Sequence, residues 1–156
     1  MKSLLSRTAL LVLALGSLFS TVAAHAAGSA AAPAKLQFAT QRQAMLAASL
    51  FARSTGGSLV LTSGTSSMEP LIHGKTYVVV AKRPYTSISK SDILLYQGRP
   101  DASKADRKTI LHRAVLQDKY GWLMSGDNNR WSESWDRVTT ANYEGTVVAI
   151  FAFPKA

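Results

Sequence analysis

The chain has 156 residues, with 18 Lys and Arg against 9 Asp and Glu, no cysteine and 47% hydrophobic residues. This length fits one domain, and the lack of cysteine excludes disulfides, thiolate-bound metals and cysteine nucleophiles. The formal net charge of +9 is compatible with a nucleic acid or an anionic membrane as partner, so the distribution of the charges decides between them.

The basic charge is concentrated at the amino end. The first acidic residue is Glu69, and the basic residues before it are Lys2, Arg7, Lys35, Arg42 and Arg53. The rest of the chain has the mildly basic balance of an ordinary domain, and no motif in it is typical of base stacking or groove reading. We therefore expect no nucleic-acid partner, and name an anionic membrane surface as a candidate partner.

Residues 1–26 have the pattern of an export signal. Lys2 and Arg7 precede an apolar run at residues 9–19, and Ala24-His25-Ala26 fits the small-x-small rule for cleavage after Ala26. A spanning helix needs about 20 apolar residues, and a generous count over residues 8–24 reaches the lower edge of that range. The alternative is therefore an uncleaved membrane anchor. Either interpretation places the rest of the chain on the extracytoplasmic, periplasmic side of a membrane.

Residues 27–57 are predicted to be a linker and one amphipathic helix. Ala, Gly, Ser and Pro fill residues 28–33, and apolar residues recur at helical spacing over 36–53. One interpretation is a helix that packs on the core of the domain. The other is a basic amphipathic helix that rests on lipid.

Residues 58–156 are predicted to form a β domain. Short runs rich in Val, Ile, Leu and aromatics are separated by turn residues, which predicts a mainly β fold, either an antiparallel sheet or a distorted barrel. The polar residues 100–108 are predicted to be an exposed loop between two strands. The predicted strands are residues 59–63, 77–82, 93–97, 110–117, 122–125 and 145–153.

Three segments of this domain carry candidate catalytic residues. A Gly- and Ser-rich turn at residues 63–70 offers a serine hydroxyl and backbone N–H groups. His112 lies inside an apolar strand and can exchange a proton near neutral pH. A turn at residues 125–129 carries Asp127, and Asp136 follows it. Each segment alone also has a structural explanation, as a loop, a strand histidine or a turn-capping aspartate.

Taken in order, these segments resemble type I signal peptidases over residues 59–151. The resemblance rests on Ser-Met-Glu-Pro at 67–70, Asp-Ile-Leu-Leu-Tyr at 92–96, His-Arg-Ala-Val at 112–115 and Ser-Gly-Asp-Asn-Asn at 125–129. Most bacterial members have a lysine before the arginine; His112 here resembles the archaeal and endoplasmic-reticulum branch. The same motif order links the chain to LexA-like self-cleaving repressors, which use lysine and are cytosolic. Gly74-Lys75 and Ser91-Asp92 stand where members often have Gly-Asp.

The resemblance implies a signal-peptidase or LexA-like β fold and a role for each candidate residue. Ser67 would be the nucleophile and His112 the general base, with Asp127 or Asp136 supporting the imidazole. The backbone N–H of Ser67 and the hydroxyl of Thr65 would meet the oxyanion. Met68 is expected to pack beneath the site, and Lys108, four residues before His112, is the fallback base.

The expected activity is that of a serine endopeptidase that cleaves exported preproteins after small residues. We expect no cofactor, and the histidines and acidic residues lack the spacing of metal ligands. The alternative is a non-catalytic exported binding or assembly module on the same fold.

Overall fold

The computed structural model describes residues 32–98, 108–130 and 133–154, with only the backbone described for 133–136. The predicted signal peptide or anchor, most of the predicted linker and the predicted loop up to residue 107 lie outside the described residues. The elements are β1 (Ala34–Gln37), α2 (Gln41–Thr55), β2 (Ser58–Leu61), β3 (Tyr77–Ala81), the short 3-10 helix η1 (Tyr85–Ser87), β4 (Ile93–Gly98), β5 (Lys108–Asp118), β6 (Gly121–Ser125), β7 (Glu133–Val138) and β8 (Tyr143–Ala152).

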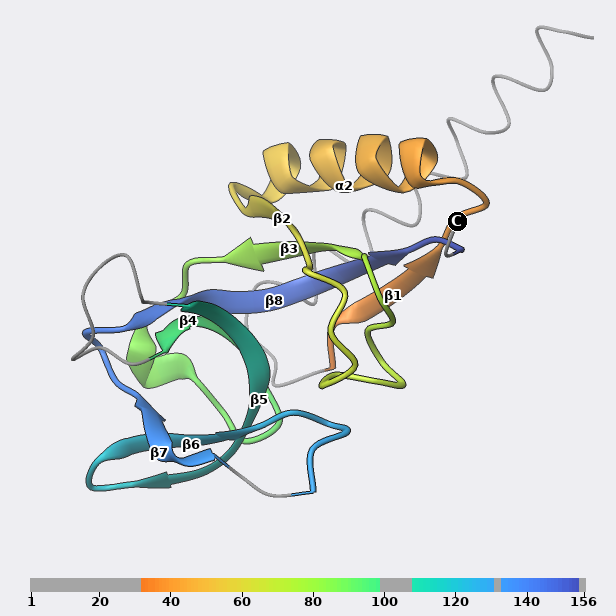
Figure 1. Ribbon diagram of the computed structural model, residues 1–156. Coiled ribbons are helices and arrows are strands. Elements are labelled where there is room, and N and C mark those ends of the chain that lie inside the picture. The colour runs from red at the N-terminus through yellow and green to blue at the C-terminus, as the bar shows by residue number, and fades with distance from the viewer. Residues whose placement is uncertain (1–31, 99–107, 131–132, 155–156) are drawn as a thin grey trace, which may run out of the picture.

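The strands form one eight-stranded sheet in the order β2-β3-β8-β4-β5-β6-β7, with β1 paired to β8 outside this path. The β1–β8 pair is parallel and the other pairs are antiparallel. Figure 1 shows β5 bending through a wide curve that carries β6 and β7 away from β3 and β8. The predicted mainly β class is confirmed, and within the described residues the path is open, ending at β2 and β7.

The predicted strands correspond to β2, β3, β4, β5, β6 and β8, each within a few residues of its observed bounds. Two strands were not predicted, β1 and β7. The sequence of β1 is AKLQ and that of β7 is ESWDRV, and neither has the β-branched apolar run that marked the others. β1 therefore depends on pairing with β8, which is distant in sequence, and β7 depends on pairing with the preceding strand β6.

Helix α2 begins later than predicted. Thr40 is its N-cap, with extended backbone and a side chain that accepts a hydrogen bond from the Gln43 N–H at 3.2 Å. The predicted start at residue 36 is wrong because Leu36 belongs to β1, where it pairs with Phe151 of β8. At the other end Gly56, with φ 65°, donates its N–H to the Ala52 carbonyl and ends the helix.

Helix α2 packs on β3 and β8 through a face of small residues (Figure 1). The buried residues of this face are Ala44, Ala47, Ala48, Phe51 and Ala52. Alanine lets the helix approach the sheet closely, and the Phe51 ring lies 5.8 Å from the Phe151 ring. The interpretation of this segment as a helix packed on the core is confirmed.

Candidate functional site

The segment that carries Ser67 leaves β2 and is tied back to the chain before β3. The Thr62 N–H donates to the Thr76 carbonyl at 2.9 Å, and the Thr62 hydroxyl donates to the Gly74 carbonyl at 2.9 Å. A turn follows, in which the Ile72 N–H donates to the Met68 carbonyl at 2.9 Å. Met68 is 3% exposed and belongs to a core cluster, which confirms its predicted packing role. The turn thus holds Ser67 next to a fixed core residue.

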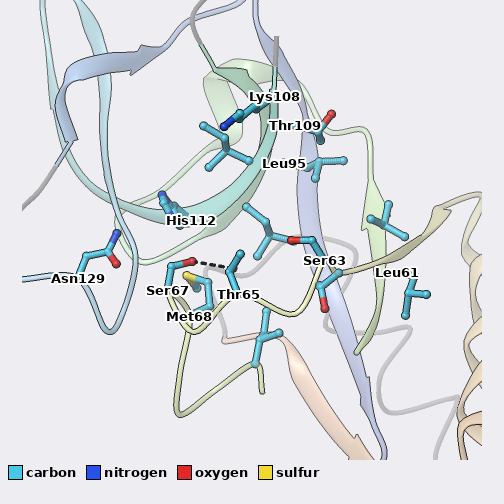
Figure 2. Close-up of a pocket in the computed structure, with 15 residues that line it drawn as sticks. Leu61, Ser63, Thr65, Ser67, Met68, Leu95, Lys108, Thr109, His112 and Asn129 are labelled. Atoms are coloured by element: carbon cyan, nitrogen blue, oxygen red, sulfur yellow. Dashed lines mark hydrogen bonds between the residues drawn. The ribbon is translucent and has the colours of Figure 1, made fainter. Parts of the chain in front are cut away.

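Ser67 and His112 line the same pocket, which has a volume of about 560 Å³ (Figure 2). His112 projects from β5 and is 5% exposed, whereas Ser67 is half-buried. The pocket wall is largely aliphatic, and no acidic residue lines it among the described residues. The aliphatic lining residues are Val60, Leu61, Ile72, Leu95, Ile110 and Leu111, with Met68 beside them.

The predicted oxyanion group is adjacent to the predicted nucleophile. Thr65 and Ser67 share a hydrogen bond between their hydroxyl oxygens at 3.3 Å, drawn as a dashed line in Figure 2. Within the described residues, the Ser67 N–H donates no hydrogen bond. A hydroxyl therefore lies beside the Ser67 hydroxyl on this side of the pocket, next to a backbone N–H that donates no described hydrogen bond.

The third segment packs directly against the first. The Asn128 N–H donates to the Ser67 carbonyl at 2.9 Å, and the Asn128 side-chain amide donates to the Ser66 carbonyl at 3.2 Å. A Cβ atom at Gly126 would lie 2.5 Å from the Ser67 carbonyl oxygen, so only glycine permits this approach. Asn129 of the same turn lines the pocket.

Asp127 of this turn binds Arg113. Its two carboxylate oxygens accept from the Arg113 guanidinium at 2.7 and 2.6 Å, and Arg113 also donates to the Ser91 carbonyl at 2.8 Å. The hydrogen bonds from Arg113 to Asp127 raise the pKa of the arginine, against the opposing effect of its burial. The described hydrogen bonds of Asp127 thus connect the turn to β5 next to His112. Whether Asp127 also supports the imidazole stays a prediction.

Of the remaining candidate residues that the structure describes with their side chains, Lys108 lines the pocket, whereas His73 is not among its lining residues. Lys108, at the start of β5, lines the pocket together with His112. Asp136 lies in β7, and its side chain is outside the described residues. His73 is 60% exposed, and its Nδ1 atom lies 3.7 Å from a Glu69 carboxylate oxygen.

The sequence analysis did not predict the ion pair of Arg113 with Asp127, although the hairpin pattern indicates it. The turn at residues 118–121 joins β5 to β6 and sets Arg113 opposite Ser125, two residues before Asp127. The register of the hairpin therefore brings the two charges together. In the described part of the chain, no three His, Cys, Asp or Glu residues cluster as metal ligands would. Nor is any helix there long and apolar enough to cross a membrane.

Comparison with models of protein families, with curated proteins and with solved structures found no match for this chain.

Proposed function

We propose that the chain is a serine endopeptidase of the signal peptidase I type, acting on exported polypeptides on the extracytoplasmic side of a membrane. The observation that carries the proposal is that Ser67 and His112 line one pocket. They come from segments 45 residues apart, and Asn128 and Asp127 hold the third segment to both.

In the proposed reaction, the Ser67 hydroxyl oxygen attacks the carbonyl carbon of a peptide bond while His112 accepts the hydroxyl proton. The C–N bond then breaks, and His112 returns this proton to the leaving amine. The acyl chain is left as an ester on Ser67. A water molecule attacks the ester, His112 accepts a proton from that water, and the proton passes to the Ser67 oxygen as the carboxylic acid leaves.

The Thr65 hydroxyl and the Ser67 N–H would stabilise the oxyanion of each tetrahedral intermediate. Their positions support this assignment, since Thr65 already lies within hydrogen-bond distance of Ser67. One such donor is worth about 10²–10³ in turnover. The aliphatic pocket wall would take an extended, uncharged stretch of substrate.

The assignment to the signal peptidase fold has support beyond the motifs. Ser91 has φ 79°. Among the described residues, every other residue with a positive φ is a glycine. Signal peptidases often have glycine at the matching position, which suits this backbone. The proposal includes export directed by residues 1–26, whether these are removed as a signal peptide or retained as an anchor.

The decisive test uses neighbouring serines. Ser67→Ala is expected to abolish cleavage of a preprotein-like peptide and labelling by a serine-reactive phosphonate probe. Ser66→Ala is the matched control, because Ser66 is exposed on the same turn and holds Asn128 through its backbone carbonyl. Cleavage by Ser67→Ala at the wild-type rate would exclude the proposed nucleophile.

The two histidines of the domain provide a second matched pair. His112→Ala is expected to lower kcat by about 10³-fold or more, while His73→Ala leaves it unchanged because His73 is largely exposed beside Glu69. Lys108→Ala should retain activity. A loss confined to Lys108→Ala would instead assign the base to this lysine.

The second candidate function is a non-catalytic exported binding or assembly module. The observation that favours it is the pairing of Asp127 with Arg113, since a carboxylate held in this way has a structural explanation without catalysis. Labelling of the wild type, but not of Ser67→Ala, by the phosphonate probe would exclude this module.

A further inference from the structure

Helix α2 has a second face, opposite to the alanines that pack on the sheet. Three large apolar residues are exposed on it: Met45 by 40%, Leu46 by 52% and Leu50 by 57%. Burial of α2 on the core does not account for these side chains, because they point away from β3 and β8. An exposed apolar set on one helix is typical of an interaction surface.

Two arginines share this outer face. Arg42, Leu46 and Leu50 follow each other at intervals of four residues, and Arg53 follows Leu50 by three, so the four side chains lie on one side of the helix. Both arginines are exposed. The helix contains no acidic residue, and the sequence up to Met68 contains none either. The face is therefore apolar and purely cationic.

We propose that this outer face of α2 binds the surface of an anionic phospholipid membrane. Leucine and methionine side chains would enter the boundary between headgroups and acyl chains. The arginine stems would lie along that boundary, and their guanidinium groups would reach the lipid phosphates, which they can bind with two parallel hydrogen bonds. The proposal rests on the proposed extracytoplasmic site of action, and it identifies how the domain would lie on the membrane.

The geometry of the helix suits this contact. Its 15 residues extend over about 22 Å, and its inner face fixes it lengthwise on the sheet (Figure 1). The helix is therefore already folded before it meets lipid, so binding does not have to compensate for the entropy of ordering it. Each arginine near an anionic surface is expected to strengthen binding about fivefold.

The lack of cysteine permits a test that separates this face from residues 1–26. In the full-length chain, Leu50→Cys carries the only thiol, which is labelled with a polarity-sensitive fluorophore. Leu116→Cys is the matched control, because Leu116 of β5 is also 57% exposed. Vesicles of phosphatidylcholine with phosphatidylglycerol are compared with vesicles of phosphatidylcholine alone.

With the anionic vesicles, we expect the fluorescence emission of the label at position 50 to shift to shorter wavelength. The emission of the label at position 116 should stay unchanged. Arg42→Gln and Arg53→Gln, each in the labelled chain, should weaken the response about fivefold, whereas Lys90→Gln, at an exposed lysine outside α2, should not. An equal response at 116, or none at 50 in chains that sediment with the vesicles, would overturn the proposal. A response at 50 that follows protein concentration without lipid would assign the face to a second copy instead.

Failure of this proposal is distinguishable from failure of the proposed catalytic function. The α2 variants should cleave a soluble peptide at the wild-type rate without lipid, since Arg42, Leu50 and Arg53 do not line the pocket. Ser67→Ala should keep the lipid response of the labelled chain.

Discussion

The region around α2 and the region around Ser67 are held together by different physical means. Around α2, the contacts are apolar: alanines and Phe51 meet the aromatic and aliphatic side chains of β3 and β8. Around Ser67, the turn at residues 126–129 is held by backbone hydrogen bonds, one ion pair and a glycine contact. Apolar packing is non-directional and tolerates small shifts, whereas hydrogen bonds fix atoms in place. We expect the region around α2 to determine stability and the region around Ser67 to determine activity.

The largest expected effect on stability comes from Phe51→Ala. Phe51 is 1% exposed and its ring contacts the Phe151 ring, so its loss should lower the free energy of unfolding by about 3–5 kcal/mol. Urea denaturation measures this change. Leu50→Ala, at the neighbouring exposed residue, should stay within about 0.5 kcal/mol of wild type. If Phe51→Ala also lowered the rate of peptide cleavage by the folded protein, the two regions would not be independent.

Gly126→Ala tests the region around Ser67. The new Cβ would lie 2.5 Å from the Ser67 carbonyl oxygen and 2.7 Å from the side-chain Nδ2 atom of Asn129, so the turn has to move. We expect a loss of about 1–3 kcal/mol in stability and about a hundredfold loss of peptide cleavage, because small misplacements of catalytic groups are costly.

Gly74→Ala is the control for this prediction, since its Cβ would meet no atom within 4 Å although its φ is 51°. It should lose about 1 kcal/mol from backbone strain alone and keep its activity. Wild-type cleavage by Gly126→Ala would mean that the turn does not position Ser67.

Asp127→Asn distinguishes two functions for this carboxylate. Asp127 and Arg113 are 17% and 24% exposed, and removing one charge should cost about 1–2 kcal/mol. If Asp127 acts only by holding the turn to β5, kcat should fall by less than about a hundredfold and the midpoints of its pH profile should not move. A fall of about 10⁴ would assign Asp127 to orienting His112. Asp118→Asn, which removes the charge of the carboxylate paired with Arg137, should leave cleavage unchanged.

The sequence predicted the apolar strands well and the polar contacts poorly, for a physical reason. Runs such as Tyr77–Ala81 and Ile93–Gly98 carry their own β signal in branched and aromatic residues. Strands β1 and β7 carry no such signal, because pairing with β8 and with β6, respectively, creates them. The motif order indicated that Ser67 and His112 belong together, and both line one pocket. The contact of Asn128 with Ser66 and Ser67 depends on turn geometry that residue types alone do not specify.

Ser91→Gly should have the smallest effect on the free energy of unfolding, and it should raise this free energy where the other substitutions lower it. Ser91 has φ 79°, a conformation that costs a residue with a Cβ about 1–2 kcal/mol. Glycine removes this cost but raises the conformational entropy of the unfolded chain, which lowers stability by a smaller amount. Its two hydrogen bonds, N–H to the Ala114 carbonyl and carbonyl from Arg113, both at 2.8 Å, use only backbone atoms of Ser91 and would remain. A gain of about 0.5–1 kcal/mol in urea denaturation is therefore expected, with unchanged cleavage. Ser89→Gly, where φ is not positive, should lose stability by a similar amount. A destabilised Ser91→Gly would indicate that the serine side chain stabilises this bend, and that its left-handed backbone carries little strain next to Arg113.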